Sequence, residues 1–215
     1  MTTPTRRGSI LSSLDDATRR LVRLAAIIAC GDELRVRAAL VEAVDGVSGS
    51  WIEELILQSY LFCGFPRSLN AMREWRRLTG QHELPPIEEQ DQDEWRRRGE
   101  ATCARVYGQM YDRLRVNIRA LHPELDDWMI VEGYGKVLSR PALDLPRREL
   151  CIVAACAASA QARQLHSHLH GAINVGAAPE VVTEAIDSLA GLVSDHDLTS
   201  AQLLWRRVQN QLSSP

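Results

Sequence analysis

The chain has 215 residues, of which 45% are apolar and 25% charged, so it is long enough to bury a substantial core as a globular protein. Its net charge of −3, with arginines spread along the chain, gives no electrostatic case for a nucleic-acid partner. No apolar run approaches the roughly 18 residues of a membrane span, and residues 1–14 lack the apolar region of a signal peptide. Because five cysteines without framework spacing favour a reducing compartment, we expect a cytoplasmic protein without a membrane partner.

Capping signals divide the start of the chain into helices. Asp15 is placed to cap a helix that runs to Cys30, and Asp32 to cap a second helix that ends before Gly46. Apolar residues in 16–29 recur at the spacing of one helical stripe, as expected for a helix that faces the core.

Two further helices are predicted before residue 80. Ser50 and Glu53 have the S-x-x-E spacing of a capping box, which predicts the start of a third helix ending near Phe62. Pro66 suits the first turn of a fourth helix, and Gly80 follows its last turn.

The rest of the chain is also predicted to be helical. Residues 81–93 contain two prolines and an acidic run without apolar periodicity, which indicates a solvated linker. A helical stretch is expected from about Glu94 to Leu121, where His122 and Pro123 break it. Residues 127–138 precede four further helices, which are expected near 145–158, 161–174, 179–193 and 198–211. No strand-like alternation bounded by hairpin signals is present, so the predicted fold class is all-α.

The sequence also matches itself, which predicts a duplicated helical domain. Residues 14–29 align with 143–158 at an offset of 129, and several later positions align at an offset of 130. Identical pairs are Leu14/Leu143, Asp15/Asp144, Arg19/Arg148, Leu21/Leu150, Ala25/Ala154, Ala26/Ala155, Ala29/Ala158, Gly46/Gly176, Glu54/Glu184, Ile56/Ile186 and Trp75-Arg76-Arg77/Trp205-Arg206-Arg207. Such a long period is typical of a tandem duplication and not of a solenoid. We therefore predict a degenerate N-terminal copy (1–80), the linker (81–93) and a complete C-terminal copy (94–215).

One long motif resembles a known family. Residues 134–150, Tyr-Gly-Lys-Val-Leu-Ser-Arg-Pro-Ala-Leu-Asp-Leu-Pro-Arg-Arg-Glu-Leu, are followed by Gln-Leu-His-Ser-His at 164–168 and Gly-Ala-Ile-Asn-Val-Gly at 171–176. Together with the lead-in segments at 98–100 and 106–108, this string resembles the carboxymuconolactone decarboxylase and alkylhydroperoxidase-like superfamily over about residues 94–210. The resemblance implies a helical fold and an oligomer, in which a fused pair of copies replaces two subunits. It predicts a homo-oligomer, either a trimer of two-copy chains or a dimer or hexamer.

The resemblance also separates two activities. Members of the peroxidase branch carry two redox cysteines between a glutamate and a histidine, and here the equivalent positions are Glu149, Gln161, Gln164 and His168. An amide cannot form a thiolate or a disulfide, so peroxidase chemistry at this site is excluded. The decarboxylase branch keeps the Gln-Leu-x-x-His arrangement found here. The first copy has Arg20 and Ala38 in place of the glutamate and histidine, so it is interpreted as structural.

The resemblance therefore implies a cofactor-independent lyase, or a related acid/base enzyme, acting on a small carboxylated lactone or ring-cleavage product. Its catalytic candidates are His168 as acid/base and Glu149 as its partner, because a decarboxylated carbanion needs a proton from a positioned acid. An arginine at 140, 147 or 148 is a candidate to orient the substrate carboxylate. The substrate-binding candidates are Gln164, Tyr134, Arg140 and Arg148.

Plainer interpretations compete with this one. Glu149 is also expected as a structural carboxylate paired with an arginine, and His168 as a satisfied core histidine. His166 and His170 share a helix face, but they lack the further ligand that a metal site needs, so a solvated or subunit-facing surface is expected and no metal.

Two other functions remain open. One is a thiol-dependent alkylhydroperoxidase-like antioxidant enzyme that uses a non-equivalent cysteine such as Cys30 or Cys156. The other is a non-catalytic oligomeric binding protein. Cys151 and Cys156 lie five positions apart, too far around a helix for a disulfide, and are expected as buried thiols.

Overall fold

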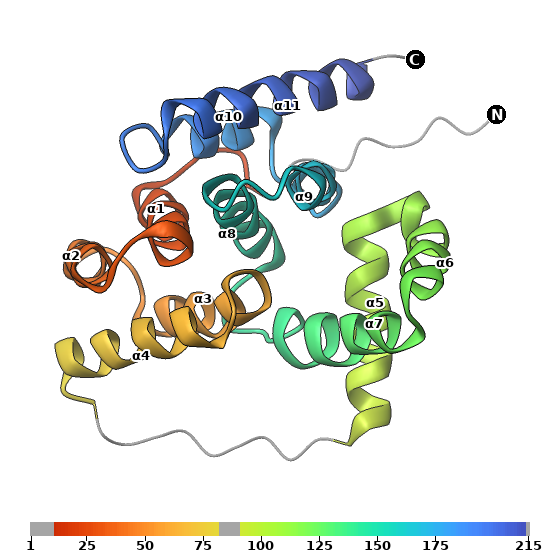
Figure 1. Ribbon diagram of the computed structural model, residues 1–215, viewed down its shortest axis with the longest axis horizontal. Coiled ribbons are helices and arrows are strands. Elements are labelled where there is room, and N and C mark those ends of the chain that lie inside the picture. Colours follow the sequence, from red (N-terminus) through yellow and green to blue (C-terminus); the bar gives the residue numbers. More distant parts are fainter. Residues whose placement is uncertain (1–10, 82–90, 214–215) are drawn as a thin grey trace.

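Helices form the regular structure of this protein in the computed structural model, which describes residues 11–81 and 91–213 (Figure 1). The N-terminal half contains α1 (Asp16–Cys30), α2 (Glu33–Val44), α3 (Gly49–Cys63) and α4 (Phe65–Thr79). The C-terminal half contains α5 (Gln92–Tyr107), the 3-10 turn η1 (Gly108–Met110), α6 (Tyr111–Leu121), α7 (Pro123–Trp128), the π-helix η2 (Met129–Leu138), α8 (Leu145–Ala158), α9 (Ala162–Asn174), α10 (Pro179–Asp187) and α11 (Asp195–Ser213). Within the described ranges, extended pairing is limited to one bridge between Leu11 and Ala177. The prediction of an all-α fold is confirmed.

Three of the predicted helix ends are confirmed by their capping geometry. The Asp15 side chain accepts a hydrogen bond from the backbone N–H of Thr18, and that of Asp32 accepts one from Arg35. Each bond satisfies a backbone donor that the first turn of a helix leaves free. Gly80 follows α4 with a φ of 63°, the left-handed conformation in which glycine ends helices without strain.

The predicted capping box at the start of α3 is wrong. The helix begins one residue before Ser50, and its capping residue Ser48 makes no side-chain capping bond. The Ser50 hydroxyl instead bonds the Ser48 hydroxyl at 2.9 Å. The carboxylate of Glu53 accepts hydrogen bonds from Trp75 Nε1 and Arg76 Nη1 of α4. The Glu53 carboxylate therefore accepts hydrogen bonds from side chains of α4. The capping-box pattern predicts instead that it accepts one from a backbone N–H at the start of its own helix.

The helical stretch predicted over 94–121 is present and ends at Leu121, but the chain turns a corner within it. Gly108 has a φ of 53° and a ψ of −126°, a conformation that ends α5 and redirects the chain through η1 into α6. The helix predicted over 179–193 is shorter, since α10 ends at Asp187. Most of the predicted linker, residues 82–90, lies outside the described residues.

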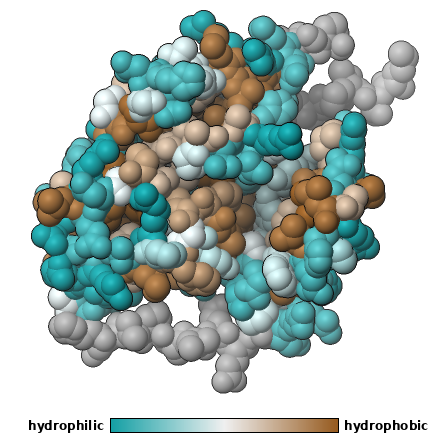
Figure 2. All heavy atoms as spheres, in the orientation of Figure 1, coloured by the Kyte–Doolittle hydropathy of each residue, from teal (hydrophilic) through white to brown (hydrophobic). Residues whose placement is uncertain are grey.

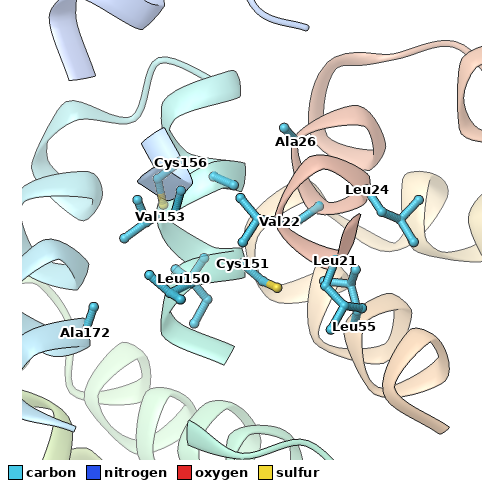
Figure 3. Close-up of a cluster of buried hydrophobic side chains, with 14 of the residues drawn as sticks. Leu21, Val22, Leu24, Ala26, Leu55, Leu150, Cys151, Val153, Cys156 and Ala172 are labelled. Atoms are coloured by element: carbon cyan, nitrogen blue, oxygen red, sulfur yellow. The ribbon is translucent and has the colours of Figure 1, made fainter. Parts of the chain in front are cut away.

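The core is built around α1 and α8, which pack side by side although they come from opposite halves of the chain (Figure 1). In Figure 3 the side chains of Val22 and Cys151 lie between these two helices, whereas Val153 and Cys156 lie on the other side of α8. Almost every residue of α8 is buried, so neighbours cover it on all sides. One continuous hydrophobic cluster consequently includes residues of both halves.

A second close packing, between α5 and η2, shapes the neighbourhood of α9. A Cβ atom on Gly99 would lie 2.1 Å from the carbonyl oxygen of Ile130, and one on Gly135 would lie 2.1 Å from that of Trp95. Glycines at both positions therefore let the two helices cross backbone to backbone. In Figure 1, α5, α6 and α7 form a group at one side of the molecule, next to α9.

The surface is mixed in character. On the face shown in Figure 2, hydrophobic residues gather in the middle, and hydrophilic residues surround them. None of the described helices combines the length and apolar character needed to cross a membrane.

Candidate acid–base site

Glu149 is carried into the core by the first turns of α8. The Asp144 side chain accepts a hydrogen bond from the backbone N–H of Arg147, and Pro146 lies in the first turn, so the helix starts just before Glu149. The surrounding residues of α8 are apolar and buried, and Glu149 itself is 0% exposed. Burial of a carboxylate requires a partner that compensates for the loss of water.

That partner is His168 on α9, the helix that follows α8. The Nδ1 atom of His168 lies 2.8 Å from Oε2 of Glu149, and the histidine side chain is 6% exposed. The chain reverses between the two helices at Ala160, whose φ of 55° is uncommon for a residue other than glycine. The structure therefore brings the two candidate catalytic residues into direct contact.

Gly171 provides the space for this contact. A Cβ atom at this position would lie 2.5 Å from Oε2 of Glu149 and 2.8 Å from Cγ1 of Val106 on α5. A side chain of any size would therefore press on the carboxylate oxygen that bonds His168. The absence of a side chain lets α8, α9 and α5 meet at one point.

Aromatic rings surround the histidine. Phe62, at the end of α3, meets the His168 ring edge-on at a centroid distance of 5.5 Å. Tyr107, the last residue of α5, lies 6.4 Å from the same ring and 6.2 Å from the ring of Tyr134 on η2. The two tyrosine hydroxyls are hydrogen-bonded, and burial raises the pKa of both Tyr107 and Tyr134 above the ordinary value. Both phenols therefore remain protonated at neutral pH.

The sequence-based list contained Tyr134 but neither Tyr107 nor Phe62. Tyr107 stands directly before Gly108, where the chain turns, and it belongs to the segment 106–108 of the family-like string. Phe62 comes from the N-terminal half, which had been interpreted as structural. No local pattern in the sequence connects it with His168.

One oxygen of Glu149 is left without a partner. Oε2 bonds His168, whereas Oε1 is fully enclosed and makes no hydrogen bond within the described residues. Buried polar atoms are nearly always hydrogen-bonded, so an enclosed unpaired oxygen is characteristic of a functional site or of an internal water position. The structural alternative, a carboxylate paired with an arginine, is wrong for Glu149, since its partner is a histidine.

None of the three candidate arginines contacts this pair: Arg147 donates hydrogen bonds to Thr18 and Asp15 of the N-terminal half, and Arg140 and Arg148 bind Glu54. Glu54 of α3 accepts hydrogen bonds from Nε of Arg140 at 2.8 Å and from Nη2 of Arg148 at 2.6 Å. Arg148 is 0% exposed and also donates to the Gln58 side chain and to the Leu143 carbonyl. Their predicted role in orienting a substrate is therefore corrected to a structural one, because both guanidinium groups join the two halves of the chain.

Gln164 is likewise separate from the pair. It lies one turn before His168 on α9, but its side chain is exposed, and no contact with Glu149 or His168 is recorded for it. Its role as a substrate contact stays a prediction. Tyr134 borders the site only through Tyr107.

The thiols lie mostly in surroundings that suppress their reactivity. All five cysteines are free. Burial raises the pKa of Cys63 to about 11 and that of Cys103, Cys151 and Cys156 to about 12. Because the thiolate is the nucleophile, these four side chains are poorly suited to attack a peroxide at neutral pH.

The outer face of α9 borders a pocket of about 670 Å³, which α5, η1, α6 and α11 complete. His166 and His170 line it with ring centroids 4.9 Å apart, and both side chains are half-buried. Glu149 and His168 are not among its lining residues, but Tyr107 is. Within the described part of the chain, no group of three or more metal-ligating side chains is found.

Comparison with known proteins gives matches that include the segment holding this pair. Residues 123–196 match the model of the carboxymuconolactone decarboxylase family, and this segment contains both Glu149 and His168. Over 175 residues the chain is 29% identical to "Peroxisomal protein 2" of Schizosaccharomyces pombe, a match that covers 77% of this chain and 80% of that protein. The part of the chain that holds the Glu149–His168 pair is therefore similar to the carboxymuconolactone decarboxylase family.

Proposed function

We propose that the Glu149–His168 pair is the acid/base centre of a cofactor-independent lyase that acts on a small carboxylated lactone or a related ring-cleavage product. The observation that carries this proposal is the 2.8 Å contact between Oε2 of Glu149 and Nδ1 of His168 in a buried, aromatic-lined position. The match of residues 123–196 to the decarboxylase family supports the same class of reaction.

Glu149 acts in this proposal by orienting His168. A carboxylate that accepts a hydrogen bond from Nδ1 fixes the imidazole tautomer and stabilises the protonated ring. The other nitrogen, Nε2, is then the atom that gives and takes protons. It makes no hydrogen bond within the described residues, so no described group competes for its proton.

Decarboxylation breaks the bond between the substrate carboxylate and the ring carbon. The electron pair of that bond moves into the conjugated lactone carbonyl, carbon dioxide leaves, and His168 Nε2 delivers a proton to the carbon. The Tyr107 hydroxyl, which its raised pKa keeps protonated, is the proposed donor to the negatively charged carbonyl oxygen. Solvent then restores the proton on His168.

The test is the turnover of carboxymuconolactone, followed by the loss of ultraviolet absorbance and the release of carbon dioxide. We expect His168→Gln to lower kcat at least about 100-fold, because positioned acid/base groups contribute about 10² to 10⁴. Glu149→Gln should also lower kcat, and treatment with a chelator should leave it unchanged.

His166→Gln is the matched control, since His166 lies on the same helix but does not contact Glu149. It should retain wild-type turnover. Absence of turnover in the wild-type protein, or full turnover in His168→Gln, contradicts the proposal. Peroxide consumption that is lost in Cys156→Ser would favour a thiol-dependent enzyme instead.

We also infer that the N-terminal half is a duplicated copy that acts as a packing partner. The helices α1, α2, α3 and α4 correspond in order to α8, α9, α10 and α11 at offsets close to 129 and 130. Two ion pairs are related in the same way: Arg19 bonds Glu184, and its counterpart Arg148 bonds Glu54, the counterpart of Glu184. Such an exchange of equivalent partners is typical of a two-fold interface.

A further inference from the structure

The pocket on the outer face of α9 is a second feature with the properties of a binding site. Its volume of about 670 Å³ lies within the range usual for small-molecule sites. His166 and His170 line it, and a helix turns by about 100° per residue, so His168 between them points to another side of α9. The pocket and the acid–base pair are therefore neighbours that share Tyr107 as a wall.

The ionised side chain in the lining is Arg113 of α6, and no aspartate or glutamate lines the pocket. On the same helix, Arg115 and Arg119 are both held by the carboxylate of Asp126. Arg113, in contrast, makes no hydrogen bond or ion pair with any described residue. Its guanidinium group is thus available to a ligand from outside the chain.

The rest of the lining indicates what kind of ligand fits. Val106, Tyr107, Met110 and Leu114 give the pocket an apolar side. Burial and the neighbouring His166 lower the pKa of His170, so that ring remains neutral and adds no second cation. One arginine beside apolar and uncharged polar side chains suits a molecule with an apolar body and a single negative group.

We propose that this pocket binds a small organic monocarboxylate, with its carboxylate on Arg113 and its apolar body against Tyr107 and Leu114. A guanidinium group binds a carboxylate through two parallel hydrogen bonds, which selects for a planar anion. The proposal goes beyond the lyase function, because neither Glu149 nor His168 lines this pocket.

The test compares two probes of the same shape, phenylacetate and its neutral amide phenylacetamide. Each is titrated into the full-length protein at neutral pH, and the imidazole C–H signals of the histidines are followed by NMR. Phenylacetate should saturate and shift the His166 and His170 signals, while those of His122 and His196 stay in place. In Arg113→Gln its affinity should fall about tenfold or more, to the level of phenylacetamide, because a charge-assisted pair is lost.

Arg105→Gln is the matched control. Arg105 is exposed on α5, makes no hydrogen bond or ion pair with a described residue, and does not line the pocket, so its variant should bind phenylacetate as the wild type does. Three results would overturn the proposal. The wild type could bind phenylacetate and phenylacetamide with equal affinity, Arg113→Gln could bind phenylacetate as tightly as the wild type, or phenylacetate could cause no saturable shift of the His166 and His170 signals. His168→Gln should still bind phenylacetate, so the pocket and the lyase proposal succeed or fail separately.

Discussion

At the scale of single residues, the candidate site depends on a glycine, Gly171, as much as on the side chains of Glu149 and His168. Glu149 and His168 meet because Gly171 leaves room for the carboxylate between α8, α9 and α5. Protein interiors are close-packed, so a neighbour cannot simply move aside. The conformation of Glu149 is therefore determined by the backbone of α9 as well as by its own helix.

Gly171→Ala should disturb this contact. The added methyl group would lie 2.5 Å from Oε2 of Glu149, and we expect it to lower the free energy of unfolding by about 1–3 kcal/mol, as overpacking does. Urea denaturation followed by circular dichroism measures the change.

Gly133→Ala is its control. A Cβ atom there would have only the Trp128 carbonyl oxygen nearby, at 4.0 Å, so its effect should stay within about 0.5–1 kcal/mol. Similar losses in the two variants would show that Gly171 has no special steric role.

At the scale of helices, the two halves are joined by buried ionic contacts as well as by apolar packing. The carboxylate of Glu54 on α3 forms ion pairs with both Arg140 and Arg148, and Arg148 is 0% exposed. Burial lowers the pKa of Arg148, and the hydrogen bond that Arg148 donates to the Glu54 carboxylate opposes that effect. Each guanidinium group therefore depends on a carboxylate from the other half.

Glu54→Leu should be strongly destabilising. It leaves the buried Arg148 without its carboxylate partner, and breaking such a pair costs about 3–5 kcal/mol. The free energy of unfolding from chemical denaturation measures the loss, and the double variant Glu54→Leu/Arg148→Met should recover part of it.

An exposed ion pair provides the comparison. Glu132 and Lys136 are 44% and 40% exposed, so Glu132→Leu should change the free energy of unfolding by no more than about 0.5 kcal/mol. A loss in Glu54→Leu as small as this would mean that water reaches Arg148 and replaces the carboxylate.

At the scale of the whole molecule, one core includes both halves and encloses several thiols. Burial holds the pKa of Cys103, Cys151 and Cys156 at about 12, whereas the ordinary value is 9.0. In the unfolded chain these thiols ionise near their ordinary value. The unfolded state therefore binds fewer protons than the folded state above about pH 9, and it becomes more favourable as pH rises.

The stability of the protein should consequently fall between pH 9 and 12. Each of these thiols contributes a loss of about 1.4 kcal/mol per pH unit, and below pH 9 its contribution to stability is fully present. Cys151→Ala should reduce the slope of unfolding free energy against pH by about that amount, measured by urea denaturation from pH 8 to 11.

Val153→Ala removes buried volume from the same helix without removing a titrating group, so it should lower stability at every pH and leave the slope unchanged. An unchanged slope in Cys151→Ala would contradict the argument from burial.

Much of the helical architecture followed from local patterns. Asp15 and Asp32 marked helix starts, and Gly80 marked a helix end, because a cap involves only the residues of one turn. The family-like string likewise pointed to Glu149 and His168. The corner at Gly108 and the true start of α3 were not predicted; Gly108 lies against Asn174 of α9, and Glu53 accepts hydrogen bonds from Trp75 and Arg76 of α4.

By itself, therefore, the sequence determined the all-α class, most helix boundaries and the two residues at the centre of the candidate site. The fold class and the helix boundaries depend on hydrogen bonds and apolar spacing within a few residues, whereas Glu149 and His168 were indicated by the resemblance of their segment to a known family. Only the tertiary structure decided which partners the charged groups take: Glu54 binds Arg140 and Arg148, and Arg113 remains free beside a pocket. A long charged side chain can reach many neighbours, and the packing of the helices decides which of them it meets.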